Sequence, residues 1–140
     1  MDNPTRPVAS DDGSVEVHDS VLAGLSFAGD DVVIRLSPAF VHRSPGRAGV
    51  DPGTVWLQTI DLVISEAVVD RSPSGWPVVL WDGSISVDGA RWDNVIPLPL
   101  ALAGAVAFEA VTIPGESLSV RGNRVEVVLQ GSPRYLEPFP

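Results

Sequence analysis

A short phrase occurs three times in this chain: an apolar residue, Ser, an apolar residue, any residue and Gly. The copies lie at residues 25–29, 85–89 and 118–122. Alternation of this kind is typical of a strand with one buried face, and Gly adopts the positive φ that a tight turn requires. Each copy therefore predicts a β-hairpin that turns at its Gly.

Placing that Gly and the residue after it in the turn predicts the register of each hairpin. The cross-strand pairs expected nearest the three turns are Phe27–Val32, Val87–Trp92 and Val120–Val125. In the first hairpin the next pair on the same face is Leu25–Ile34, so one face is apolar throughout. The copies are unequally spaced, which is not the pattern of a solenoid or propeller.

The rest of the chain continues the β pattern. Residues 54–70 are rich in Val and Ile and predict one long strand, while 77–81 and 105–113 predict shorter ones. Turns are expected at 72–75, 82–83 and 114–115. The fold class predicted is all-β: a single-domain antiparallel β-sandwich or barrel of roughly nine to eleven short strands joined by tight hairpins.

The two ends of the chain are expected to lie outside the strands. Residues 1–13 are polar and contain Pro, so they predict a disordered N-terminal tail before a single all-β domain at 14–140. Residues 134–140 predict a short C-terminal tail. Within the domain, Pro97 and Pro99 are two residues apart, as an edge strand tolerates on its open side. An open edge would also permit a homo-oligomer.

Composition excludes several classes of function. The chain has no Cys, which removes thiol nucleophiles and Cys-ligated zinc, and its nine basic residues are all Arg. The net charge of −9 disfavours nucleic acid and anionic membranes and favours, if any partner, a basic protein. No nucleotide-binding motif is present, so no cofactor is expected. Without a signal peptide or a long apolar run, the protein is expected to be cytoplasmic.

The histidines, His18 and His42, are the first candidates for chemistry. His18-Asp19-Ser20 has the composition of a hydrolytic triad, but neighbouring strand residues point to opposite faces. A metal site would need both histidines with a carboxylate such as Asp19, Asp61 or Glu66, yet no His-x-His spacing supports one. Each histidine is instead predicted to be a partly buried strand-end residue that makes a backbone hydrogen bond.

Three other features are candidates for a binding or catalytic site. The loop at 43–53 carries Arg43 and Arg47 in an acidic protein, and loops on a rigid scaffold often hold binding residues. Trp76 follows Gly75 in a predicted turn, where an exposed indole would stack on a sugar or anchor a protein partner. Trp81 and Trp92 are expected in the core. The carboxylates Asp61, Glu66 and Glu109 lie in apolar strands, where an inward-facing pair would serve as acid and base.

The segment Val-His-Asp-Ser-Val-Leu at 17–22, followed by the Gly-Asp-Asp hairpin, resembles the first strand of small bacterial all-β domains that open with His-Asp-Ser-x-Leu. Some of those domains are grouped with immunity proteins, which block a partner toxin. The resemblance does not extend beyond residue 40. It implies a non-catalytic binder and marks His18 and Asp19 as signature positions without giving them a role.

Together these observations favour a small acidic protein-binding module of the immunity type that is not an enzyme. Two alternatives remain open at this stage. One is a small-ligand or carbohydrate binder that uses a barrel mouth or an exposed Trp76. The other is an enzyme that pairs His18 or His42 with a carboxylate.

Overall fold

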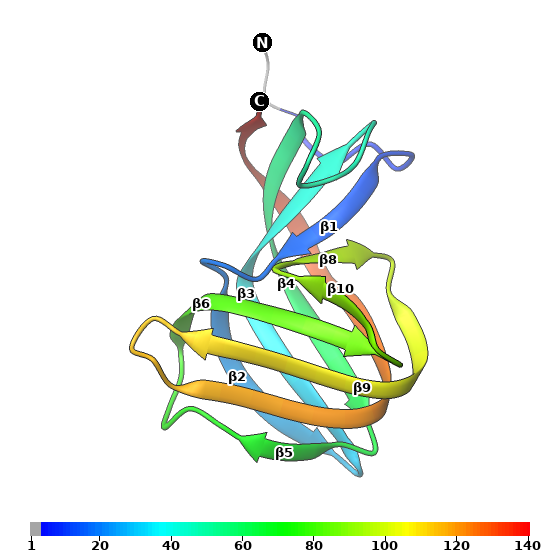
Figure 1. Ribbon diagram of the computed structural model, residues 1–140. Helices are drawn as coiled ribbons and strands as arrows, with labels where there is room; N and C mark the ends of the chain where they lie inside the picture. Colours follow the sequence, from blue (N-terminus) through cyan, green and yellow to red (C-terminus); the bar gives the residue numbers. More distant parts are fainter. Residues whose placement is uncertain (1–3) are drawn as a thin grey trace.

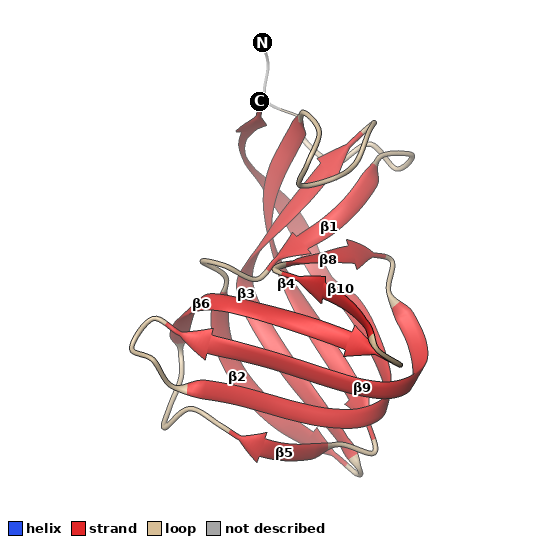
Figure 2. Cartoon of the chain, in the orientation of Figure 1, coloured by secondary structure: helices blue, strands red, loops and turns tan. Residues whose placement is uncertain are grey.

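The computed structural model describes residues 4–140, which form ten strands and no helix (Figures 1 and 2). The strands are β1 Asp12–Glu16, β2 Val21–Ala28, β3 Asp31–Ser44, β4 Gly53–Ser65, β5 Val68–Arg71, β6 Val78–Val87, β7 Ala90–Asp93, β8 Val95–Leu98, β9 Ala101–Thr112 and β10 Ser117–Phe139. The predicted all-β fold is confirmed. Of the predicted N-terminal tail, residues 1–3 lie outside the described residues, and β1 begins at Asp12.

Six of these strands form a closed antiparallel ring, so the fold is a barrel. Going around it, β2 pairs with β3, β3 with β4, β4 with β10, β10 with β9, β9 with β6, and β6 again with β2. The β2–β6 junction is the shortest of these ladders. It consists of Val21 opposite Val79 and Leu22 opposite Val78. We call this junction, with its flanking residues 18–24 and 76–81, the seam.

The sheet continues beyond one end of the barrel, and we call this part the extension. The far halves of β3, β4 and β10 continue beyond the barrel, and β1 and β8 add to the β3 side (Figure 1). β8 contains Pro97 and ends the strand order, as predicted for an edge strand. No helix among residues 4–140 has the length and apolar character needed to cross a membrane.

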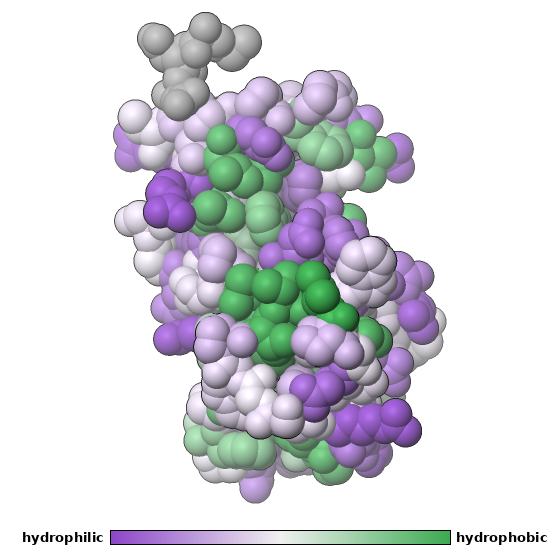
Figure 3. Space-filling model, turned by 90° about the vertical axis from the view of Figure 1, so that its left-hand side faces the viewer, coloured by the Kyte–Doolittle hydropathy of each residue, from purple (hydrophilic) through white to green (hydrophobic). Residues whose placement is uncertain are grey.

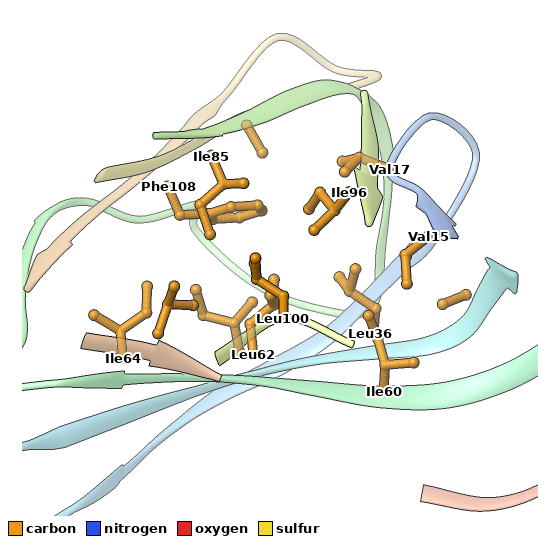
Figure 4. Close-up of a cluster of buried hydrophobic side chains, with 14 of the residues drawn as sticks. Val15, Val17, Leu36, Ile60, Leu62, Ile64, Ile85, Ile96, Leu100 and Phe108 are labelled. Atoms are coloured by element: carbon orange, nitrogen blue, oxygen red, sulfur yellow. The ribbon is translucent and has the colours of Figure 1, made fainter. Parts of the chain in front are cut away.

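Apolar side chains fill the barrel interior. Figure 4 shows Leu36, Ile60 and Leu62 on one wall and Ile85 and Phe108 on the opposite wall, all of them 0% exposed. Each side chain of this size that is fully buried stabilises the fold by about 1.5–3 kcal/mol. The interior is therefore a packed core that holds the outer face of each strand in a fixed position.

The first hairpin forms as predicted near its turn. Gly29 has φ 62° and Phe27 pairs with Val32. Further out, a register shift between Leu22 and Gly24 sets Leu22 opposite Leu36, where a regular ladder would place Ala23. Phe27 lies beyond the core at the hairpin tip and is 71% exposed, so the apolar face is only partly buried.

The register predicted for the second hairpin is wrong. Its turn residues are Asp88 and Gly89, with φ 50° and 86°, and Ile85 therefore pairs with Trp92. Two positive φ values in succession are typical of a type I′ turn, which matches the twist of the strands it joins. Asp88, the residue before the Gly, thus belongs to the turn, and Trp92 pairs with Ile85 two residues before the predicted partner Val87.

The third predicted hairpin does not exist, because β10 continues through Gly122 with a bulge on its β9 side between Gly122 and Arg124. Val120 pairs with Phe108 on β9, and Val125 pairs with both Leu102 on β9 and Ile64 on β4. A Cβ atom at position 122 would collide with the Ile64 side chain and lie 2.5 Å from the Ser65 carbonyl oxygen. Gly122 therefore allows β10 and β4 to approach each other closely.

Other boundaries also differ from those predicted. Residues 82–83 form no turn, since β6 continues through them with a bulge between Leu80 and Asp82. The predicted strand at 54–70 divides at Glu66, which has φ 46°. The C-terminal segment is part of β10 and pairs with β4 as far as Phe139.

Candidate functional site

The seam places three of the predicted site residues on one side of the barrel: His18, Asp19 and Trp76. The Asp19 amide donates to the Leu80 carbonyl at 2.9 Å, which places the β1–β2 connection beside β6. At the other end of the seam, Trp76 packs over Gly24. A Cβ atom there would lie 3.3 Å from the indole Nε1.

His18 is held at this position by its backbone and its ring. Its amide donates to the Asn94 side-chain oxygen at 2.7 Å, and ring atom Nδ1 donates to the Trp81 carbonyl. Its ring also packs edge-on against the Trp81 indole, with 5.1 Å between centroids. The backbone hydrogen bond predicted for His18 is confirmed.

The hydrogen bond to the Trp81 carbonyl is the main cause that raises the pKa of His18. Burial opposes the shift, and the nearby charges of Asp19, Glu16 and Asp82 add to it. Asp19 Oδ2 lies 3.4 Å from His18 Nε2, so a carboxylate lies beside the ring nitrogen that does not bond to the Trp81 carbonyl. This end of the seam therefore carries a proton-binding group at its surface.

Ser20 takes no part in a triad with His18 and Asp19. It is 0% exposed, and its hydroxyl donates to the Glu16 carbonyl at 2.6 Å and accepts from the Phe40 amide at 3.2 Å. These bonds tie the β1–β2 turn to β3, so the role of Ser20 is structural.

Trp81 is exposed, and the prediction that it fills the core is wrong. Leu80 pairs with Thr112 and Asp82 with Val111, which leaves Trp81 in a bulge of β6. A bulge re-aims side chains, and here Leu80 points inward with 0% exposure while Trp81 is 59% exposed. Trp92 is half-buried, and Trp56 is buried.

Trp81 belongs to an exposed apolar surface that covers the seam and the adjoining end of β9. Its members are Trp76, Val79, Trp81, Val111 and Ile113, each 37% exposed or more. The Ile113 amide donates to the Val79 carbonyl, so β6 and β9 remain side by side here. Figure 3 shows hydrophobic residues gathered in the middle of this side of the molecule. We call these five residues the seam face.

Acidic groups border the seam face. Asp82, Asp93 and Glu109 line a shallow hollow of about 140 Å³ next to Val111. Arg91 is the one basic residue in that lining, and its Nε donates to Asp93 at 2.7 Å. This bond is the main cause that raises the pKa of Arg91, with Glu109 and Asp82 contributing less. Three carboxylates around one guanidinium leave the border negative.

Hydrogen bonds hold the loop that carries Trp76 in place. Glu116, in the turn between β9 and β10, accepts hydrogen bonds from the Ser74 amide and the Ser74 hydroxyl, both at 2.9 Å. The Glu116 amide in turn donates to the Thr112 hydroxyl at 2.9 Å. A surface held in this way loses little conformational entropy when a partner binds.

The other predicted residues, His42, Arg43 and Arg47, lie in the extension and do not join the seam. His42 is on β3 opposite Ser14 and is 5% exposed. Neither of its ring nitrogens makes a hydrogen bond, and the Glu16 carboxylate oxygen lies 3.7 Å from Nε2. The backbone hydrogen bond predicted for His42 is therefore wrong.

The predicted arginine loop is shorter than expected and is folded onto β1. Arg43 is part of β3, which leaves residues 45–52 as the connection. Ala48 is buried: its amide donates to Asp12 at 3.0 Å, and its carbonyl accepts from the Ser14 hydroxyl at 3.1 Å. Arg47 remains exposed, 3.9 Å from Asp51.

The candidate carboxylates do not form a catalytic pair. Asp61 is buried and accepts two hydrogen bonds from Arg35, both at 2.9 Å, whereas Glu66 accepts one from Asn123 at 2.8 Å. Glu109 borders the seam face. Within residues 4–140 no group of His, Asp and Glu is arranged to hold a metal ion.

Of the five residues of the seam face, the sequence singled out Trp76 as a binding candidate, and two further candidates, His18 and Asp19, lie beside it at one end of the seam. Sequence reasoning placed Trp81 in the core and did not single out Val79, Val111 or Ile113. Searches of known protein families, of curated proteins and of solved structures found no match to this chain.

Proposed function

We propose that this protein is a non-catalytic module that binds a basic protein partner through the seam face. The observation that carries the proposal is the exposure of Trp81 and Trp76 beside Val79 and Ile113 on a rigid part of the barrel. A contiguous apolar surface on a small domain marks an interaction site, and Trp is among the residues that contribute most to binding energy.

Charge supports a basic partner. The chain carries −9 overall, and Asp82, Asp93 and Glu109 lie at the border of the seam face. Opposite charges at the rim of an interface accelerate association and select the partner. The resemblance of residues 17–22 to domains grouped with immunity proteins is consistent with a toxin as that partner, and His18 and Asp19 lie at one end of the same face.

Site-specific photo-crosslinking tests the proposal. A benzophenone amino acid replaces Trp81 in one protein and Leu102, a 38% exposed residue of β9 outside the seam face, in a second. In cells that make the protein, we expect a covalent adduct with a single basic protein from position 81 and none from position 102.

The adduct must also depend on charge and on the neighbouring apolar residues. Raising the salt concentration in a lysate is expected to reduce its yield, as is a Val79→Ser substitution in the crosslinking protein. Equal adducts at positions 81 and 102, or a yield that neither change affects, would show that the seam face is not the binding surface.

A further inference from the structure

Two bulges face each other across β4 on the side of the barrel away from the seam. On β3 the register shifts between Leu36 and Ala39, and on β10 it shifts between Gln130 and Arg134. Both shifts occur at the level of residues 57–60 of β4. Bulges bend strands and re-aim side chains, and they are frequent beside functional sites.

Between the bulges lies an open hollow of about 340 Å³, the lower end of the size range of small-molecule sites. Its lining consists of Ser37, Pro38, Leu57, Gln58, Thr59, Ser132 and Arg134. The Ser37 and Thr59 hydroxyls are 2.6 Å apart, and the Gln58 amide nitrogen donates to the Gly131 carbonyl at 3.0 Å. Side-chain bonds across the ladder therefore hold both bulges in place.

The lining of the hollow carries one charge, which is positive, in an acidic protein. Arg134 lines it, no Asp or Glu does, and among the ion pairs of residues 4–140 none involves Arg134. The nearest carboxylate along β4 is that of Asp61, which already accepts hydrogen bonds from Arg35 and from Gln130. Arg134 is thus available to a ligand.

We propose that this hollow binds a small hydroxylated carboxylate, independently of the seam face. A guanidinium offers two parallel N–H donors that match the two oxygens of a carboxylate. One positive charge in a chain of net charge −9 suits a monoanion better than a phosphate dianion. The hydroxyls of Ser37, Thr59 and Ser132 can exchange hydrogen bonds with ligand hydroxyls, and Pro38 and Leu57 contact its carbon skeleton.

Titration of the whole ¹⁵N-labelled protein with D-glucuronate tests the proposal by NMR. D-Glucose has similar hydroxyls without the carboxylate, acetate has the carboxylate without the hydroxyls, and inorganic phosphate tests for binding of any anion. We expect saturable shifts from glucuronate at the backbone amides of residues 37, 57–59, 132 and 134; Pro38 and Pro133 have no amide proton. Binding of the other three compounds should be at least about tenfold weaker, since each lacks part of the match.

Variants separate the site from general charge effects. Arg134→Gln should weaken glucuronate binding by about tenfold or more, because a charge-assisted bidentate contact is lost. Thr59→Val should weaken it by a smaller factor while it keeps the shape of the side chain. Arg124→Gln removes the same charge from β10 outside the hollow and should leave binding unchanged. If glucuronate causes no saturable shift, or if Arg134→Gln and Arg124→Gln have equal effects, the proposal is wrong.

Discussion

Replacing Gly122 by Ala tests the course of β10 through the barrel. The new methyl carbon would lie 2.5 Å from the Ser65 carbonyl oxygen and would collide with the Ile64 side chain. Nonbonded carbon contacts are optimal near 3.5 Å, so β10 and β4 must separate by about 1 Å. Overpacking of this kind costs about 1–3 kcal/mol, and both obstacles are strand residues of the barrel wall, so we expect about 2–3 kcal/mol.

Urea denaturation followed by tryptophan fluorescence measures this loss. For a domain of this size the same change lowers Tm by about 5–10 °C. Gly75→Ala is the matched control, because a Cβ atom there meets nothing within 4 Å and the backbone φ is not positive. Its free energy of unfolding should stay within about 0.5 kcal/mol of wild type or rise slightly. Equal stability of the two variants would contradict the reasoning and would favour an open turn at Gly122.

Three further predictions concern titratable groups. The Trp81 carbonyl raises the pKa of His18, so the stability that the protonated ring contributes is complete below the unfolded pKa and is lost as pH rises through the folded pKa. In urea denaturation between about pH 5 and about pH 8, His18→Gln should remove this loss of stability. NMR titration of Asp19→Asn should show the pKa of His18 only partly lowered, because the Trp81 carbonyl remains. The hydrogen bond from Arg121 lowers the pKa of Asp70, so Arg121→Gln should raise that pKa in a carboxyl NMR titration. The higher free energy of unfolding of wild type over this variant should disappear as pH falls through the pKa of Asp70 in the folded protein. Because neither ring nitrogen of His42 makes a hydrogen bond, His42→Leu should raise the free energy of unfolding at neutral pH by about 1 kcal/mol, and a clear loss in urea denaturation would refute this.

Local signals in the sequence predict local structure well. Gly29 lies in a turn because the residues on both sides of it alternate and nothing else requires a glycine there. Gly122 has the same surroundings along the chain, yet its lack of a side chain serves contact with Ile64 and Ser65, more than fifty residues earlier. A single sequence does not distinguish these two uses of glycine, so the third hairpin was predicted wrongly.

The candidate site also depends on strand pairings between residues that are far apart in the sequence. Trp76 was predicted to be exposed from its turn, and this is confirmed. Trp81 was assigned to the core, whereas it lies in a bulge of β6 between Leu80 and Asp82 and its indole is 59% exposed. His18 lies near Trp81 only because β2 closes the barrel against β6, and no local pattern predicts that closure.

The most direct test of the central claim is the dissociation constant of the crosslinked partner, measured by calorimetry with three purified proteins. Relative to wild type, Trp81→Ala should bind about 30-fold more weakly, which corresponds to the loss of about 2 kcal/mol expected at a dominant interface residue. Leu102→Ala should bind as wild type does. Equal affinity of all three proteins would contradict the assignment of the seam face as the binding surface.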